Sequence, residues 1–97
     1  MPRSTLERIR EKIRLGLYDM SLHAMDEMAE DGLDIIDIEC AILKGRIARA
    51  ERSDPRGTKY VVEGVAVDGV TPVGIAGRFT STGQYLIITV YQIAEPG

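Results

Sequence analysis

Apolar residues recur every three or four positions at the start of this chain. In residues 4–17 they form a single stripe with charged residues on the other sides, and its members are Leu6, Ile9, Ile13 and Leu17. This spacing is typical of a helix that buries one face. Ser4 and Glu7 have the spacing of a capping box, and Gly16 permits a left-handed end. The pattern therefore predicts a first helix between Ser4 and Gly16.

Two further helices are predicted before residue 45. Ser21 caps the second helix, which ends at Asp31 and Gly32. The side chains expected to face inward from it are Leu22, Met25, Met28 and Ala29. Asp34 caps the third helix, which ends at Gly45. Its apolar residues leave only a narrow polar edge, and they are Ile35, Ile36, Ile38, Cys40, Ala41, Ile42 and Leu43. We expect so apolar a helix to be central.

Beyond Gly45 the apolar period shortens to about two residues, which is typical of strands. The predicted strands are Arg46–Arg52, Thr58–Val67, Val73–Phe79 and Tyr85–Gln92. The connections between them are short, as at Asp68-Gly69, and short connections join antiparallel neighbours. Helices followed by strands are typical of the α+β class. We therefore predict a single domain over residues 1–97, with three N-terminal helices packed on one face of a four-stranded antiparallel meander.

Alternation along the strands separates the two faces of the predicted sheet. The face expected to pack on the helices carries Val61, Val65, Val67, Val73, Ile75, Phe79, Leu86, Ile88 and Val90. The opposite face collects Tyr60, Val62, Gly64, Ala66, Gly74, Ala76, Arg78, Tyr85, Ile87, Thr89 and Tyr91. Small residues in the middle, with Tyr, Thr and Arg at the rim, predict a shallow trough for a ligand. A solvent-exposed face, or one covered by a second copy, fits the same pattern.

The overall charge argues against a protein held to nucleic acid by bulk electrostatics. The net charge is −3, from 12 basic and 15 acidic side chains. The distribution is uneven, however, because residues 44–60 hold only Glu51 and Asp54 as acids. The cations of that segment are Lys44, Arg46, Arg49, Arg52, Arg56 and Lys59. The segment fits either a surface that meets an anion or a solvated edge strand whose charges discourage aggregation.

Composition also limits the kinds of site. One cysteine cannot form an internal disulfide, and four-ligand zinc binding needs partners that the chain lacks. The sequence contains neither a glycine-rich phosphate loop nor a nucleophile elbow. We therefore expect no metal ion and no cofactor. Residues 1–14 lack the apolar run of a secretory signal, and no apolar stretch reaches the roughly 18 residues that span a bilayer, so a cytoplasmic location is expected.

His23 is the only histidine of the chain and lies in the first turn of the second predicted helix. Glu27 follows four residues later on the same helix face. An imidazole held by a carboxylate is a candidate general acid or base near neutral pH. Packing beside the helix cap is the structural alternative. The residues alone leave both roles open.

Four short patterns resemble the bacterial "domain of unknown function 4258" family. They are Tyr18-x-x-Ser21-x-His23-Ala24, the stretch Gly-Leu-x-x-x-Asp-Ile-Glu-x-Ala-Ile-Leu-x-Gly from Gly32 to Gly45, Asp54-x-Arg56-Gly57-x-Lys59-Tyr60, and Ile87-Ile88-Thr89-Val90-Tyr91. The resemblance covers about residues 18–91. The family's layout is similar to that of RelE-like toxins and barnase-like ribonucleases. The resemblance implies a RelE-like fold and a small RNA-cleaving toxin domain held in check by an antitoxin protein.

Metal-independent RNA cleavage needs a base for the 2′-hydroxyl proton, an acid for the leaving oxygen and cations for the phosphate. The candidates for these catalytic steps are His23, Glu27, Arg78 and Tyr91. The candidates for binding the RNA substrate are Arg56, Lys59, Tyr60 and Thr89. Tyrosine rings stack on bases, and a threonine hydroxyl bonds a phosphate oxygen.

A second class of function fits the same residues. In it the protein is a non-catalytic module of the same fold that docks a protein segment, or a second copy to form a homodimer. The docking surface is then the tyrosine-rimmed face or the edge of the strand Arg46–Arg52. Acidic net charge favours this module, whereas the set of His23, Arg78 and Tyr91 favours the ribonuclease. The sequence leaves open whether the protein is an enzyme.

Overall fold

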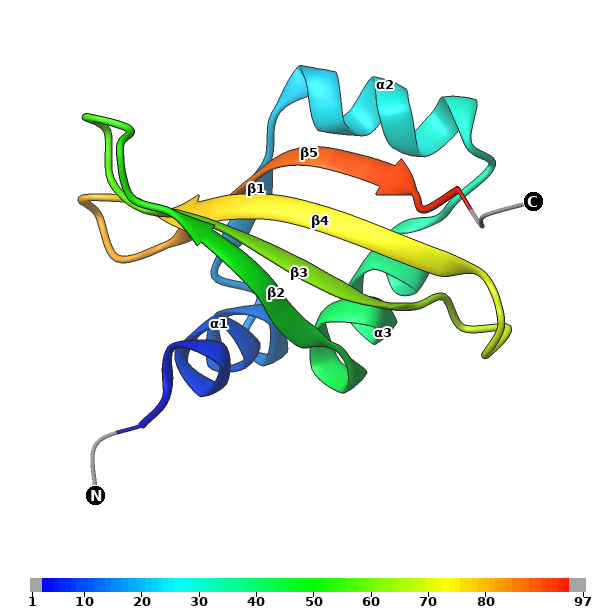
Figure 1. Ribbon diagram of the computed structural model, residues 1–97, viewed down its shortest axis with the longest axis horizontal. Coiled ribbons are helices and arrows are strands. Elements are labelled where there is room, and N and C mark those ends of the chain that lie inside the picture. Colours follow the sequence, from blue (N-terminus) through cyan, green and yellow to red (C-terminus); the bar gives the residue numbers. More distant parts are fainter. Residues whose placement is uncertain (1–2, 95–97) are drawn as a thin grey trace.

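The computed structural model describes residues 3–94 and combines three helices with a five-stranded sheet (Figure 1). In chain order the elements are α1 (Thr5–Arg14), β1 (Tyr18–Met20), α2 (Leu22–Glu30), α3 (Ile35–Lys44), β2 (Arg46–Glu51), β3 (Lys59–Val65), β4 (Pro72–Phe79) and β5 (Tyr85–Gln92). The predicted α+β class, the three helices and the four long strands are confirmed. Ser4 and Ser21 cap α1 and α2, because each hydroxyl accepts a hydrogen bond from the backbone amide three residues on. Within residues 3–94 no helix is long and apolar enough to cross a membrane.

The strands lie in the order β1-β5-β4-β3-β2 (Figure 1). β2 to β5 form the predicted antiparallel meander. The prediction of four strands is nevertheless wrong by one, because β1 pairs in parallel with the beginning of β5, where Tyr18 lies opposite Tyr85. A strand of three residues is too short to show a period of two, so β1 looks like a connection in the sequence. The two helices that follow β1 belong to the long crossover that a parallel pair requires.

The core lies between the helices and one face of the sheet. Its buried members are Ile9, Ile13, Ala24, Leu33, Ile38, Ala41, Ile42, Val62, Ala66, Val73, Ile75, Tyr85, Ile87 and Val90. α3 is central as predicted, since Ile38, Ala41 and Ile42 are fully buried. It lies very close to β3 because Gly64 has no side chain, and a Cβ at that position would meet the backbone of Ala41. Gly64 therefore sets how near the central helix approaches the sheet.

The predicted assignment of faces is wrong for β3. Its helix side carries Tyr60, Val62 and Ala66, whereas Val65 is only half-buried and Val67, beyond the strand, is exposed. Charged residues alternate with valine on one side of β3, at Lys59, Val61, Glu63 and Val65, whereas the other side carries no charge. The uncharged side, and not the side with Val61 and Val65, is the one that faces the helices. The close approach of α3 determines which side of β3 faces the helices. Only a glycine leaves room for the backbone of α3, so the side of β3 that carries Gly64 must face that helix.

The predicted face of β5 is right for Val90 and wrong for Leu86 and Ile88. The pairing of β4 with β5 skips Ile88, which is therefore an extra residue in the strand, a β-bulge. Tyr85 and Ile87 consequently face the helices before the bulge, and Val90 faces them after it. A strict period of two cannot anticipate this change of side.

α2 runs along the outer edge of β5 (Figure 1). Ala24 is its buried residue and Met28 is half-buried, whereas Leu22 is 80 % exposed and Met25 is 45 % exposed. The prediction that Leu22, Met25 and Ala29 face inward is therefore wrong. An apolar stripe predicts burial against a sheet face, but this helix covers a strand edge with a narrower contact.

Polar side chains attach α2 to that edge. The Glu27 carboxylate accepts a hydrogen bond from the amide of Val90 at 3.1 Å, and the Asp31 carboxylate accepts one from the amide of Gln92 at 3.0 Å. The Ser21 hydroxyl donates to the carbonyl of Ile88 at 2.9 Å. α2 thus supplies partners to the part of β5 that extends beyond β1.

Candidate anion-binding site

We call the sheet face turned away from the core the open face, although Val61 and Ala76 on it are buried. Its side chains come from β3, β4 and β5, and they are Lys59, Val61, Glu63, Gly74, Ala76, Arg78, Leu86, Ile88, Thr89 and Tyr91. Arg78 pairs with Leu86 across the β4–β5 ladder, and the β3–β4 register places Lys59 on its other side. These three residues therefore form a row across three strands, at the end of the sheet nearest the β2–β3 loop, residues 52–58.

A pocket of about 270 Å³ lies over this row. Its lining residues are Ser21, Asp54, Arg56, Lys59, Arg78, Leu86 and Ile88, and they define the Arg78 pocket. Three cations thus meet two aliphatic side chains in one hollow. This combination suits an anionic group joined to an apolar or planar one.

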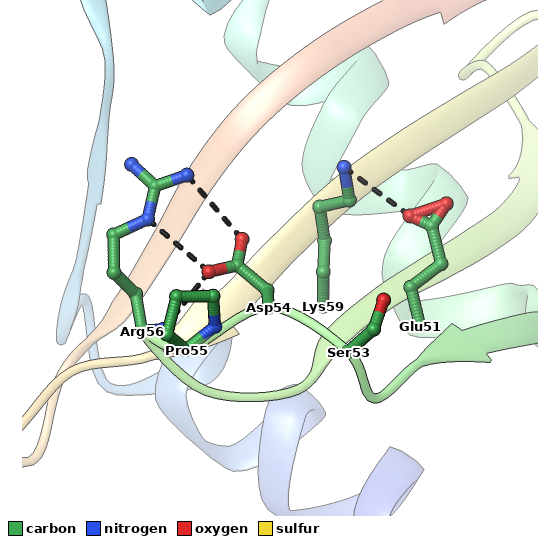
Figure 2. A pocket seen from close by; sticks show the side chains of 6 residues that line it. All are labelled: Glu51, Ser53, Asp54, Pro55, Arg56 and Lys59. Carbon is green, nitrogen blue, oxygen red and sulfur yellow. Dashed lines mark hydrogen bonds and ion pairs between the residues drawn. The ribbon is translucent and has the colours of Figure 1, made fainter.

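Two of the three cations form ion pairs, Arg56 within the β2–β3 loop and Lys59 between the strands that the loop connects (Figure 2). Arg56 donates from Nε and Nη2 to the Asp54 carboxylate, at 3.2 and 3.3 Å. Lys59 Nζ lies 3.2 Å from a carboxylate oxygen of Glu51. Arg78 has no hydrogen-bond or ion-pair partner in the part of the chain that the structure describes. Arg78 is therefore the cation most available to a ligand.

The same loop borders a second, wider depression of about 740 Å³ (Figure 2). Its lining residues are Glu51, Ser53, Asp54, Pro55, Arg56 and Lys59. The wider depression and the Arg78 pocket share three lining residues, Asp54, Arg56 and Lys59. The two hollows therefore belong to one charged surface.

Asp54 is the acidic member of the Arg78 pocket. Its Oδ1 accepts a hydrogen bond from the amide of Arg56 at 2.9 Å, in addition to the bonds from the guanidinium. These hydrogen bonds, and the positive charges of Arg56 and Arg78, hold the pKa of Asp54 below its ordinary value. The carboxylate is therefore ionised at neutral pH and offsets part of the positive charge around it.

His23 and Glu27 contact each other as predicted. His23 Nε2 lies 3.1 Å from Glu27 Oε1, the oxygen that also accepts from the amide of Val90. The imidazole is 68 % exposed, so a reactant can reach it. Glu27 is half-buried and also attaches α2 to β5, so it has a structural role that sequence reasoning missed.

The other predicted site residues are spread along the open face or lie behind it. Tyr91 covers Gly74, where a Cβ would meet its ring, and Thr89 pairs with Ala76. Tyr60 lies on the helix side, edge-on to Phe79, with a centroid distance of 6.2 Å. The predicted tyrosine-rimmed trough is therefore wrong, because its members belong to two different faces. Arg56, Lys59 and Arg78 are the predicted residues that one pocket brings together.

Distance along β4 separates Arg78 from the other catalytic candidates. Tyr91 pairs with Gly74, four residues from Arg78, which corresponds to about 13 Å at roughly 3.3 Å per strand residue. The His23–Glu27 pair is attached at Val90, which pairs with Ile75, about 10 Å from Arg78 along the same strand. The backbone positions of these groups are therefore spread along the sheet and do not converge on one point as the residues of the Arg78 pocket do.

Four residues of the Arg78 pocket were not predicted to belong to a site. The sequence indicates Ser21 only as a helix cap, and strict alternation predicts the wrong face for Leu86 and Ile88 because of the bulge. In the sequence, Asp54 stands out only as one of two acids in the basic segment of residues 44–60. Its position two residues before Arg56, in a loop, is a usable signal, since such an aspartate bonds the amide two residues on. Within residues 3–94 no group of three or more His, Cys, Asp or Glu side chains is placed to hold a metal ion.

Comparison with known families adds one finding. Residues 20–92 match the family described as Domain of unknown function (DUF4258). The chain belongs to this family. The DUF4258 match runs from the end of β1 to the end of β5 and includes every residue that lines the Arg78 pocket. No curated protein and no solved structure was found to match the chain.

Proposed function

We propose that this DUF4258 protein is a metal-independent ribonuclease-like domain that binds single-stranded RNA on its open face. The observation that carries the proposal is the charge of the half-buried Arg78, which lines one pocket with further cations and with the aliphatic side chains of Leu86 and Ile88. A phosphate would bind the guanidinium of Arg78, and a base would pack on the aliphatic side chains of Leu86 and Ile88. Unpaired nucleotides present both groups together, which favours a single strand over a duplex.

The proposed RNA path follows β5 from the Arg78 pocket towards Tyr91. Arg78 then anchors one phosphate, and the Tyr91 ring stacks on a base about 13 Å away along the sheet. The His23–Glu27 pair flanks this path at Val90, between the two anchors. Arg78 therefore binds substrate in this proposal, although the sequence suggested a catalytic role for it.

Cleavage in this proposal uses the RNA's own 2′-hydroxyl. His23 takes the hydroxyl proton, the 2′-oxygen bonds to phosphorus, and the bond from phosphorus to the 5′-oxygen breaks. His23 then donates this proton to the leaving 5′-oxygen. The products are a 2′,3′-cyclic phosphate and a 5′-hydroxyl. Glu27 orients the imidazole and stabilises it when it is protonated, as the 3.1 Å contact permits.

The arrangement of the fold supports the same proposal. α1 and α3 pack on one face of the meander and leave the other face for substrate, as expected of the RelE-like and barnase-like layout that the sequence resembles. A toxin of this kind needs a partner that blocks the open face. We propose an antitoxin protein that covers the Arg78 pocket with acidic side chains.

The test separates binding from chemistry. In an assay of single-stranded RNA cleavage with EDTA present, Arg78→Ala raises KM, whereas His23→Ala leaves KM unchanged and lowers kcat about 10²- to 10⁴-fold. Arg14→Ala is the matched control, since it removes the same charge from α1, and Arg14 does not line the pocket. RNA with 2′-O-methyl groups stays intact. Wild-type protein that leaves RNA uncut under these conditions contradicts the ribonuclease.

The second candidate is a non-catalytic binding module, and the open edge of β2 favours it. Among residues 3–94, β2 is the last strand of the sheet, with no strand on its outer side. An extended segment of a partner, or a second copy, would add there as another strand. Ala48→Pro removes a backbone amide from β2 at the irregular pairing between Ile47 and Arg49, where the pairing with β3 skips this residue. Under this candidate sedimentation detects self-association that Ala48→Pro weakens, and the wild-type protein does not cleave RNA.

A further inference from the structure

Asp54 stands where an incoming phosphate would have to bind. Its carboxylate occupies the bidentate position on Arg56, the geometry that arginine also offers to phosphate. It shares the Arg78 pocket with Lys59 and Arg78. Figure 2 shows the carboxylate held between the backbone and the guanidinium of Arg56. The pocket therefore contains an anion that belongs to the chain itself.

We infer that Asp54 is a built-in competitor that keeps Arg56 from RNA and so limits the affinity of the Arg78 pocket for phosphodiesters. The inference rests on the proposed function and specifies how that site is regulated. With Asp54 in place, a phosphate finds Arg78 unpaired but Arg56 already neutralised. The phosphate and the carboxylate also repel each other within one hollow.

A purely structural role for Asp54 makes a different prediction. Its side chain closes a local turn by accepting from the amide of Arg56, and its carbonyl accepts from the amide of Gly57 at 3.1 Å. Asparagine accepts the same backbone hydrogen bond without a charge. Asp54→Asn therefore keeps the turn and removes only the competing anion.

Asp68 provides a matched control in the connection between β3 and β4. Its carboxylate accepts from the amides of Val70 and Thr71, both at 2.9 Å, so it also closes a local turn. Asp68→Asn changes the net charge by the same amount but removes no charge from the lining of the Arg78 pocket. Any effect of overall charge alone appears equally in both variants.

The experiment measures the affinity of each full-length variant for a short fluorescent 2′-O-methyl RNA, which binds without being cleaved. Asp54→Asn is expected to tighten binding about three- to fivefold, because one nearby repulsive charge is lost. It should also steepen the dependence of log K on log salt by about 0.7, since Arg56 then adds one phosphate contact. Asp68→Asn leaves both quantities at their wild-type values.

Three outcomes are distinguishable. Tighter binding by Asp54→Asn alone supports the competitor. The competitor role of Asp54 is contradicted if wild type, Asp54→Asn and Asp68→Asn bind RNA equally. If Arg78→Ala binds more weakly than all three, the proposed RNA site is still supported. Absence of RNA binding in wild type and in both asparagine variants overturns the proposed function and the competitor together.

Discussion

Tyr85 is the largest fully buried side chain, and its hydroxyl has no hydrogen-bond partner within residues 3–94. The ring packs where a Cβ at Gly77 would lie, and it contacts Phe79 edge-on at a centroid distance of 5.2 Å. Burial raises the pKa of Tyr85 well above its ordinary value. A buried hydroxyl that has lost its water without gaining a partner destabilises the folded state.

Tyr85→Phe should therefore raise the free energy of unfolding, by about 1 kcal/mol, because it removes the unpartnered hydroxyl and keeps the ring. Tyr18→Phe is the opposite case, since the Tyr18 hydroxyl donates to Glu39 at 2.7 Å. Its loss should lower the free energy of unfolding by about 1 kcal/mol. Urea titrations of both variants measure the two changes, and a loss of stability in Tyr85→Phe would show that the hydroxyl has a partner.

Tyr18 also predicts how stability changes at alkaline pH. Burial, with the hydrogen bond and the negative charge of Glu39, raises its pKa to about 12. The folded state thus keeps the phenol proton longer than the unfolded chain does. The Tyr18 contribution is complete below the unfolded pKa of about 10 and is lost as pH rises from there towards 12. Urea titrations between pH 9 and about 11 should show a shallower decline for Tyr18→Phe than for wild type.

The residues of the Arg78 pocket differ in how far the sequence reveals them. Arg56, Lys59 and Arg78 are recognisable as cations on or beside predicted strands. Leu86 and Ile88 are not, because the bulge changes which side of β5 faces the core. Residue type indicates the chemistry of this site, whereas its geometry depends on a register shift that no local pattern specifies.

Among the elements, α2 combines a structural role with the candidate chemistry. Glu27 satisfies the amide of Val90, so Glu27→Ala should lower the free energy of unfolding by about 1–2 kcal/mol. His23→Ala should change it by less than about 0.5 kcal/mol, because the imidazole is largely exposed. Urea titration and hydrogen exchange at the Val90 amide measure both effects. Unchanged exchange in Glu27→Ala would mean that the carboxylate does not hold the β5 edge.

This difference decides which variant reports on catalysis. Under the proposed function, loss of RNA cleavage in His23→Ala would reflect chemistry, whereas loss in Glu27→Ala would include displacement of α2. The sequence predicts α2 well because Ser21 caps it, but it does not predict where the helix packs. β1 is missed for a related reason, since its pairing with β5 depends on a partner 67 residues away and on no local signal.

At the scale of the whole molecule, a net charge of −3 coexists with a local cluster of cations at one end of the open face. Binding through so few contacts should be moderate and salt-sensitive, because each phosphate contact releases counterions. Under the proposed function, the acidic remainder, which includes Glu27 on α2 and Asp31 directly after it, should restrict RNA to the open face. The overall α+β arrangement follows from the order of helical and strand periods, whereas the parallel fifth strand does not.

The most direct test of the central claim is an NMR titration of the ¹⁵N-labelled protein with single-stranded 2′-O-methyl RNA. The account predicts that chemical-shift changes concentrate on Lys59, Arg78, Leu86 and Ile88 and continue along β5 to Tyr91, while α1 and α3 are unaffected. Arg78→Ala should reduce these changes, and Arg14→Ala should not. Spectra that do not change with RNA, or shift changes centred on the β2 edge instead of the Arg78 pocket, would contradict it.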